Sequence, residues 1–291
     1  MANTAIERIA DQPELDSVAK PLSEAVVAAY QNAGDIGAAV KNALHGVWLN
    51  HPLHSVLTDI PIGAWMTTIA LDAKAASSGD RAYSRAADFA LAFGLAGAAG
   101  SAVTGLTDWS ETSGRARRIG LVHGLLNVTA TALMLTAYML RRRRERRAGE
   151  VCTVAGMGVA TAAAYLGGDL VYGQRIGVTH AVIEEPEEFT PVLASDALAE
   201  ETMQRAKTND TDLLLVRQHG SVCALAHPCA HLGGPLSEGT LKDGTVVCPW
   251  HGSEFRLDDG SVVNGPSTHA QPCFAVRERN GQIEAGPSRD A

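Results

Sequence analysis

The sequence predicts an α+β protein of two domains, an α-helical bundle followed by an all-β antiparallel sandwich. Four apolar runs rich in Ala and Gly fill the middle of the chain. From residue 189 onward the pattern changes to short apolar segments separated by Gly-containing turns, which is typical of antiparallel strands. We therefore expect an amphipathic helical segment, a helical domain, an acidic linker and a β-domain, at residues 1–57, 58–176, 177–188 and 189–288.

Composition favours a chain that is partly embedded in a membrane. Hydrophobic residues make up 46% of the 291 residues and charged residues only 19%, which is low for an ordinary soluble pair of domains. The net charge of −8 is spread unevenly, and no basic stripe indicates a nucleic-acid partner. The five Cys show no paired spacing, so we expect no disulfide framework.

The first 57 residues predict two amphipathic helices and lack the features of a signal peptide. Ser23 is expected to cap the first helix, which Gly34 would end. Asp35 is expected to cap the second, with Val47 and Trp48 on its apolar face. Such a helix either lies along a bilayer interface with Trp48 at headgroup level or packs on the neighbouring domain.

The four apolar runs predict a four-helix transmembrane bundle, at roughly 58–76, 86–107, 119–140 and 151–172. The last three hold 22 residues each, near the number needed to span the hydrocarbon core. The first is interrupted by Asp59, Asp72 and Lys74. Small residues recur at every fourth position, as in close helix packing in lipid, at Gly97, Ser101 and Gly105 and at Gly156, Ala160, Ala164 and Gly168. A soluble Ala-rich bundle is the alternative.

Charge predicts how the bundle is oriented. Nine basic residues lie on one side of the expected bundle: Lys74 near the end of the first run, Arg81 and Arg85 after it, and six Arg between the third and fourth runs. The other side has Arg115, Arg117 and Arg118. The positive-inside rule then puts both termini and the β-domain on the outer face of a cell membrane that the chain crosses several times. An Arg pair before the fourth run is also similar to a twin-arginine export signal, but a basic flank that anchors the helix is the simpler interpretation.

Two Cys and two His in the β-domain form one tetradentate set. They are arranged as Cys229-x-His231 and, after a gap of sixteen residues, Cys248-x-x-His251. Thiolate and imidazole are ligands of iron and of zinc. The ligand inventory alone therefore leaves a structural zinc site open.

The residues around these donors resemble the Rieske 2Fe-2S proteins. The resemblance rests on Cys229-Ala-His-Leu-Gly-Gly-Pro-Leu236, Cys248-Pro-Trp-His-Gly-Ser253 and Gly265-Pro266, and extends over roughly Phe189 to Pro287. It implies that the two Cys bind one iron of a 2Fe-2S cluster, that the two His bind the other, and that Pro266 belongs to a loop that covers the cluster. It also implies a small antiparallel sandwich with both ligand loops at one tip.

Departures from the high-potential branch of that family imply a low or intermediate potential. Rieske subunits of cytochrome bc complexes carry an additional, disulfide-bonded Cys in each loop, at the positions held here by Gly234 and Trp250. That branch also uses a Ser and a Tyr hydroxyl to raise the potential. Ser253 matches the Ser, but Phe255 stands in place of the Tyr. The resemblance therefore points to the ferredoxin-like branch.

The helical part resembles a family of predicted four-helix membrane domains of unknown function, which is sometimes fused to a Rieske domain. The resemblance covers about residues 45–178 and rests on His51-Pro-Leu-His54, Asp59-Ile-Pro-Ile-Gly63 and Leu121-Val-His-Gly-Leu-Leu-Asn127. It implies an architecture but no chemistry.

Ionisable residues gather at one end of the expected bundle. Because successive helices run in opposite directions, one leaflet would hold His51, His54, Asp59, Asp108, His123 and Asp169. Ionisable groups at membrane depth are usually functional. We expect a haem or quinone site, with His54 and His123 as axial haem ligands, or with His123 and Asp169 taking protons from a quinol. Ordinary polar helix ends are the alternative.

Together these features favour a membrane-bound protein that passes single electrons to a redox partner protein through a Rieske-like cluster. The alternative is a membrane-tethered ferredoxin-like component that supplies an oxygenase or reductase, and a redox or iron-responsive sensor is a third hypothesis. The sequence has no two-His-one-carboxylate signature for mononuclear iron. We therefore expect an electron carrier or a component of an oxidoreductase rather than a complete enzyme.

Overall fold

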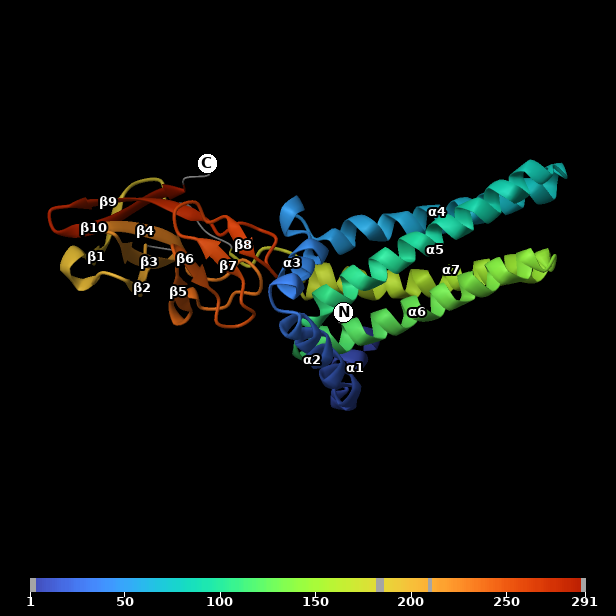
Figure 1. The fold of residues 1–291 in the computed structure, drawn as a ribbon, viewed down its shortest axis with the longest axis horizontal. Coiled ribbons are helices and arrows are strands. Elements are labelled where there is room, and N and C mark those ends of the chain that lie inside the picture. The colour runs from blue at the N-terminus through green and yellow to red at the C-terminus, as the bar shows by residue number, and fades with distance from the viewer. Residues whose placement is uncertain (1–3, 182–185, 209–210, 289–291) are drawn as a thin grey trace. The chain divides into compact units, whose positions relative to one another are not determined.

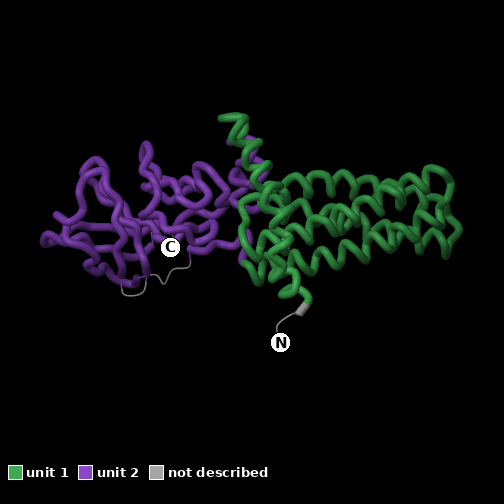
Figure 2. The backbone as a smooth tube through the Cα atoms, turned by 90° about the horizontal axis from the view of Figure 1, so that it is seen from below, with its two compact units in different colours: residues 1–37, 53–174 green, residues 38–52, 175–291 purple. Residues whose placement is uncertain are grey.

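The computed structural model describes residues 4–181, 186–208 and 211–288. They form two compact units (Figure 2), of which unit 1 comprises residues 1–37 and 53–174 and unit 2 comprises residues 38–52 and 175–291. In the described part of the chain, α-helices occupy the N-terminal half and β-strands the C-terminal part (Figure 1). Glu184 and Glu185 of the predicted acidic linker lie outside the described residues.

The N-terminal helices begin earlier than the sequence suggests. They are α1 (Thr4–Ala10), α2 (Asp16–Asn32) and α3 (Gly34–His45), with a 3-10 turn η1 (Pro13–Leu15) before α2. The prediction that Ser23 caps a helix is wrong, because Ser23 lies buried inside α2 and donates its hydroxyl hydrogen to the Lys20 carbonyl at 3.0 Å. The 3-10 turn leads directly into Asp16, whose carboxylate suits the positive end of the helix dipole. As predicted, α2 ends just before Gly34, which has a φ of +56°.

The second predicted amphipathic helix is shorter than expected. The helix α3 ends at His45, because Gly46 takes a left-handed conformation with a φ of +88°, a common way to terminate a helix. Residues Val47–Leu49 form a 3-10 turn, η2, instead of continuing the helix. The prediction that Val47 and Trp48 lie on the apolar face of one helix is therefore wrong. Trp48 is 68% exposed.

Four long helices make up most of unit 1. They are α4 (Leu53–Ser78), α5 (Arg81–Ser110), α6 (Gly114–Arg142) and α7 (Arg146–Gly168), and α7 continues into a π-helical turn η3 (Asp169–Gly173). In the described part of the chain, three helices are long and apolar enough to cross a membrane: α5, α6 and α7 with η3. The helix α4, which carries Asp59, Asp72 and Lys74, is not one of the three.

Small residues bring these helices together as the pairs α4–α5 and α6–α7. A Cβ atom added at Gly97 would collide with Ile60 of α4, and one added at Gly105 would collide with the His54 ring. In α7 the glycines and alanines that approach α6 or are buried include Gly149, Gly156, Ala160, Ala163 and Gly167, whereas the predicted Ala164 is exposed and Gly168 has no close neighbour. The helix turns once in 3.6 residues, so a strict spacing of four drifts off the contact face.

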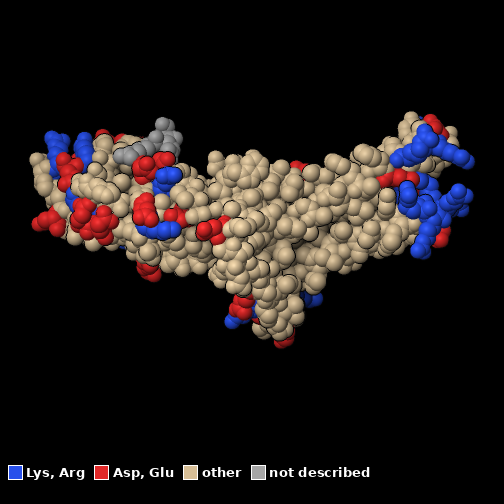
Figure 3. All heavy atoms as spheres, in the orientation of Figure 1, with Lys and Arg blue, Asp and Glu red and all other residues tan. Residues whose placement is uncertain are grey.

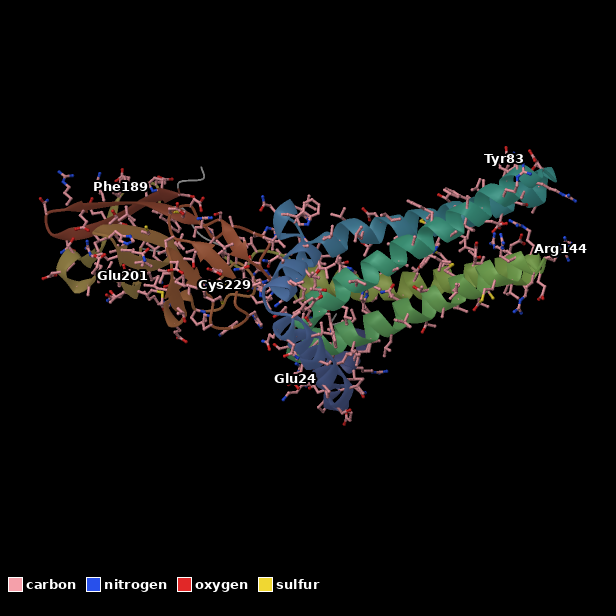
Figure 4. The ribbon with its side chains drawn as sticks, in the orientation of Figure 1. Glu24, Tyr83, Arg144, Phe189, Glu201 and Cys229 are labelled. Carbon is pink, nitrogen blue, oxygen red and sulfur yellow. The ribbon has the colours of Figure 1, made fainter. Side chains whose placement is uncertain are left out.

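A buried ion-pair network lies at the basic end of the four helices, where Figure 4 labels Tyr83 and Arg144. The Arg141 side chain is 1% exposed and bonds to Asp72, Asp88 and the Thr153 hydroxyl. Arg146 also pairs with both carboxylates, at 2.7 and 3.1 Å. Figure 3 shows further Lys and Arg side chains gathered around this end. Part of the predicted basic flank is therefore neutralised inside the bundle.

The described residues of unit 2 form two antiparallel sheets, ordered β1-β10-β9-β4-β3-β2 and β5-β6-β7-β8. The strands are β1 (Thr190–Ala194), β2 (Thr202–Lys207), β3 (Asp212–Gln218), β4 (Ser221–Ala226), β5 (Thr240–Lys242), β6 (Thr245–Val247), β7 (Glu254–Arg256), β8 (Val262–Asn264), β9 (Cys273–Arg279) and β10 (Gln282–Ser288). The predicted all-β character is confirmed. The sequence did not reveal β1, β2, β5 and β10, because they are short or rich in polar residues.

Tight turns and a common core hold the two sheets. The hairpins β3–β4, β5–β6 and β9–β10 close with two successive residues of positive φ, at His219-Gly220, Asp243-Gly244 and Asn280-Gly281, as type I′ turns require. The core draws fully buried side chains from both sheets, including Leu214, Phe255 and Phe274. The predicted filler Cys273 is buried in this core. The loops between these strands are thereby held on a rigid frame.

Candidate metal centre

Two loops of unit 2 carry the four predicted donors and have the same backbone arrangement. The first loop follows β4 and the second joins β6 to β7, and Cys229 of the first is labelled in Figure 4. In each loop the Cys N–H donates to the carbonyl five residues later, from Cys229 to Gly234 at 2.9 Å and from Cys248 to Ser253 at 2.8 Å. The two loops are therefore structural equivalents.

A glycine closes each loop. Gly233 and Gly252 have φ values of +76° and +75°, which side chains of L-residues rarely adopt. Their N–H groups donate back to the Cys229 and Cys248 carbonyls at 2.8 and 3.1 Å. Each loop thus turns its Cys and its His toward the same side without further secondary structure.

The structure brings the four donors together as two pairs. The thiol of Cys229 hydrogen-bonds to that of Cys248. The rings of His231 and His251 lie edge to face, with their centroids 5.0 Å apart. A cluster with mixed ligation needs this grouping, with two thiolates for one iron and two imidazoles for the other. Among the described residues, no three His, Cys, Asp or Glu side chains surround the position of a single metal ion.

The thiol pair loses its first proton easily. The hydrogen bond from Cys229, followed by the backbone N–H groups of Trp250 and His251, lowers the pKa of Cys248 to about 6, although burial opposes this effect. The same thiol contact, together with burial, raises the pKa of Cys229. The thiolate is the form that binds metal. Cys248 is therefore in its metal-binding form at neutral pH.

The imidazole of His231 is held neutral and has a free buried nitrogen. Burial is the main cause that lowers the pKa of His231 well below its usual value, and the neighbouring His251 adds to it. Its Nδ1 atom is buried and has no hydrogen-bond partner among the described residues. A buried polar atom without a partner is costly, and iron coordination would satisfy it. The two thiols and the two imidazoles together fit a 2Fe-2S cluster.

Ser253 lies between the second ligand loop and the segment that contains Pro266. Ser253 is fully buried, and its Oγ accepts a hydrogen bond from the Ser267 N–H at 3.0 Å. This bond uses an oxygen lone pair and leaves the hydroxyl hydrogen able to donate. Pro266 is buried in the loop between β8 and β9, and Phe255 is fully buried in β7. The structure therefore ties the predicted cover loop to the second ligand loop.

Gln271, which was not predicted from the sequence, also holds the first ligand loop. Its side-chain oxygen accepts from the Ala230 N–H at 2.8 Å, and its side-chain nitrogen donates to the Ala226 and Pro228 carbonyls at 2.7 Å. The residue is fully buried. No pattern in the sequence marks it, because it lies 41 residues from Ala230 along the chain.

In unit 1, His54 and His123 have matching environments on the two helix pairs. The Nδ1 atom of each is within hydrogen-bond distance of a backbone carbonyl on the partner helix, at 2.9 Å for His54 and 2.8 Å for His123. Each ring also packs against a glycine four residues after that carbonyl. The carbonyls belong to Ser101 and Ala163, and the glycines are Gly105 and Gly167. Both histidines were predicted from the sequence, but this repeated arrangement was not.

Other members of the predicted cluster of ionisable residues have local roles. Asp169 begins the π-helical turn and accepts from the Gln174 side-chain amide at 3.2 Å. Asn127 also has a local role, since its amide nitrogen lies 3.1 Å from the Nε2 atom of the same His123 ring. His51 and Asp59 are exposed.

Comparison with known proteins agrees with both resemblances. Residues 188–275 match the family described as Rieske [2Fe-2S] domain, and residues 50–180 match the family described as Predicted membrane protein (DUF2231). The Rieske-like part is 35% identical over 79 residues to apoptosis-inducing factor 3 of Mus musculus, covering 27% of this chain and 13% of the relative. It is 39% identical over 89 residues to the oxygenase component of dicamba O-demethylase of Stenotrophomonas maltophilia, covering 28% of this chain and 26% of the relative.

One similar solved structure is the ferredoxin of carbazole 1,9a-dioxygenase from Nocardioides aromaticivorans. It is 20% identical, its TM-score is 0.34, and the similarity covers 35% of this chain and 99% of the ferredoxin. The chain spans only 13 to 26% of the lengths of the two curated relatives. The chain thus contains a Rieske [2Fe-2S] domain at residues 188–275, preceded at residues 50–180 by a domain of the family described as Predicted membrane protein (DUF2231).

Proposed function

We propose that this protein is a membrane-bound electron carrier that passes single electrons through a 2Fe-2S cluster. Cys229 and Cys248 would hold one iron, and His231 and His251 the other. The observation that carries the proposal is the pairing of thiol with thiol and of imidazole with imidazole on two equivalent loops. The bound cluster supplies reversible one-electron chemistry.

The protein's own residues prepare and tune this site. The thiol contact favours deprotonation at Cys248, and burial keeps His231 neutral, so the donors are in the forms that bind iron. Ser253 and Pro266 are proposed to contact the cluster from the second ligand loop and the cover loop. A ligand imidazole keeps a second ring nitrogen, at which a proton is held or released as the charge of the site changes.

The residues around the site support a low or intermediate potential. Rieske centres as a class span about −150 to +300 mV. Gly234 and Trp250 cannot form a disulfide, and Phe255 offers no hydroxyl to stabilise the additional electron. These features favour a ferredoxin-like role, in which the membrane-tethered domain supplies a partner oxygenase or reductase. The likeness to the oxygenase component of a demethylase supports this second candidate.

We propose that the helices α4 to α7 all cross the membrane and that the Rieske domain lies on the outer face. Of the nine basic residues at the turns α4–α5 and α6–α7, Arg141 and Arg146 pair with buried carboxylates, which leaves seven. On the opposite side Arg115, Arg117 and Arg118 pair with Asp11 or Asp16. The asymmetry therefore remains after pairing and supports a cytoplasmic location for the basic end.

A haem or quinone site in unit 1 is a further candidate, with His54 and His123 as its ligands or proton acceptors. It is favoured by their matching bonds to helix carbonyls. A ring nitrogen that donates to a carbonyl fixes the tautomer and leaves the other nitrogen as an acceptor. In His123 this second nitrogen lies 3.1 Å from the Asn127 amide nitrogen, so Asn127 would have to move before the ring could bind iron. Glycines beside both rings leave space for an imidazole between helices.

The proposal is tested by a redox titration of the full-length protein in detergent, followed by optical absorption and electron paramagnetic resonance. We expect a Rieske signal, which should be lost when His231 or Cys248 is replaced by Ala and retained in Cys223→Ala. Retention of the signal in either ligand variant would refute the assignment. A haem absorption that disappears in His54→Ala and His123→Ala would support the site in unit 1. A C-terminal reporter enzyme that is active only outside the cytoplasm tests the orientation.

A further inference from the structure

The second half of α3 packs on the Rieske domain beside the cover loop. Residues 38–52 belong to unit 2 (Figure 2). The amide of Asn42 forms two hydrogen bonds, one with the last residue of β8 and one with the first residue of the loop that follows. Its Oδ1 atom accepts from the Gly265 N–H at 2.9 Å, and its Nδ2 atom donates to the Asn264 Oδ1 atom at 2.8 Å. One side chain of α3 therefore holds the two residues at which β8 passes into the cover loop.

The same segment fits closely around Gly265. A Cβ atom at this position would lie 3.1 Å from Val47 Cγ2 and 3.4 Å from His45 Cδ2. His45 is only 2% exposed. The contact is therefore closely packed as well as hydrogen-bonded, and it leaves little room for water between α3 and the loop.

Further hydrogen bonds lead from this contact toward the ligand loops. Asn264 donates to Glu254 Oε2 at 2.6 Å, and the other carboxylate oxygen accepts from the Thr245 hydroxyl at 2.7 Å. On the other side of Pro266, the Ser267 N–H donates to the Ser253 Oγ, and the Ser253 carbonyl accepts from the Cys248 N–H. Asn42 is thereby connected, through the cover loop, to the loop of a cluster ligand.

The chain that leaves α7 touches the first ligand loop in a similar way. The His180 N–H donates to the Ala230 carbonyl at 2.9 Å, and the Gly177 carbonyl lies 3.2 Å from His269 Nε2. Residues 38–52 precede α4, and residues 175–181 follow η3. Both connections to the helical domain are therefore built into the surroundings of the ligand loops.

We propose that Asn42 is a positioning residue for the cluster, because it fastens the cover loop and limits the access of water to the site. The inference rests on the proposed electron-carrier function. A cluster of two ferric ions, two sulfides, two thiolates and two neutral imidazoles is uncharged, and its reduced form carries one negative charge. Water stabilises the charged form more than the neutral form. Exclusion of water by the fastened loop therefore lowers the potential.

Two variants separate the bonds of Asn42. Asn42→Leu removes both hydrogen bonds and keeps a similar volume. Asn42→Asp keeps an oxygen that accepts from the Gly265 N–H but cannot donate to Asn264. The matched control is Asn32→Leu, because Asn32 is an exposed residue at the end of α2. All three are compared with the full-length protein in detergent.

Hydrogen exchange measured by mass spectrometry on peptides covering residues 262–270 reports the loop directly and does not require a cluster. We expect exchange several-fold faster than in the natural protein for Asn42→Leu, little change for Asn42→Asp, and no change for Asn32→Leu. Peptides from β3 and β4 should exchange as in the natural protein, which shows that the domain is folded. In the redox titration, the Asn42→Leu midpoint should shift to a higher potential, and the Asn42→Asp midpoint should shift less.

An unchanged midpoint in Asn42→Leu with faster exchange would overturn the positioning role, since the loop would then be released without effect on the cluster. An equal shift in Asn32→Leu would also overturn it. If the natural protein shows no Rieske signal, the proposed function fails instead. The exchange experiment would then still decide whether Asn42 fastens the loop.

Discussion

Gly234 and Trp250 lie side by side, one in each ligand loop: a Cβ atom at position 234 would be 3.1 Å from the Trp250 Cγ atom. Neighbouring loops of this kind are suited to a covalent link, which this chain lacks. The exposed Trp250 indole, at 57% exposure, packs beside the His251 ring instead. Positions 234 and 250 are therefore close enough for a disulfide, although neither residue is a Cys.

We expect the double variant Gly234→Cys with Trp250→Cys to form a disulfide, because a Cβ at position 234 would lie 3.1 Å from the Trp250 Cγ atom, near the place of a sulfur at position 250. The Cys248 sulfur, 2.8 Å from the same Cβ, would have to shift slightly. Mass spectrometry of the protein digested without reduction should show one linked peptide pair. The single variant Gly234→Cys should keep a free thiol. Alkylation of both introduced thiols, at positions 234 and 250, after mild oxidation would contradict the placement of the two loops.

Replacement of Phe255 by Tyr should raise the potential of the cluster. The residue is fully buried in β7, immediately after the second ligand loop. A hydroxyl that donates to the reduced cluster would add a hydrogen bond to a charged group, worth about 1.5 to 3 kcal/mol, or roughly 60 to 130 mV for one electron. A redox titration measures the change. An unchanged or lower midpoint would show that position 255 does not reach the cluster.

Acid should weaken the network that contains Glu254. Burial opposes ionisation of this carboxyl, but hydrogen bonds from Thr245 and Asn264 outweigh it and hold the pKa of Glu254 below its usual value. A lowered pKa in the folded state contributes stability above about pH 4.5, and this contribution is lost as the pH falls below that value. Below pH 4.5, each pH unit would lower the free energy of unfolding by at most about 1.4 kcal/mol through this carboxyl.

The measurement is the thermal midpoint of the cluster-free protein in detergent between pH 7 and pH 3.5. The natural protein should lose stability below pH 4.5 more steeply than Glu254→Gln. Glu188→Gln, at an exposed position, serves as the control and should follow the natural protein. Parallel curves for the natural protein and Glu254→Gln would contradict the prediction.

Loss of Arg141 should destabilise the helical domain strongly. Its side chain is 1% exposed and pairs with Asp72, which is 9% exposed. Removal of one partner from a buried pair costs about 3 to 5 kcal/mol when the remaining charge is left uncompensated, and somewhat less here because Arg146 still pairs with Asp72. Arg141→Met should therefore lower the thermal midpoint in detergent far more than Arg142→Ala at an exposed position. The double variant Arg141→Met with Asp72→Leu should recover much of the loss, and equal loss in both would contradict the pairing.

The ligand loops could be predicted because their information is local. Each contains its Cys, its His and its closing Gly within five residues, and the bonds that shape it join residues four or five positions apart. The apolar runs could be predicted for a similar reason, since hydropathy along one segment reports its environment. The weakly amphipathic or polar strands, such as β2 and β10, carry no such local signal.

The sequence by itself determined the chemistry of this protein: the four donors, their two loops, and the long apolar helices all follow from residue types at short spacing. Only the tertiary structure decided what surrounds them. Asn42 meets Gly265 across 223 residues of chain, Arg141 meets Asp72 across 69, and the two membrane-domain histidines each lie against a glycine of another helix. Such contacts depend on packing between elements that are distant in sequence. The spacing of residues within any one segment does not predict that packing.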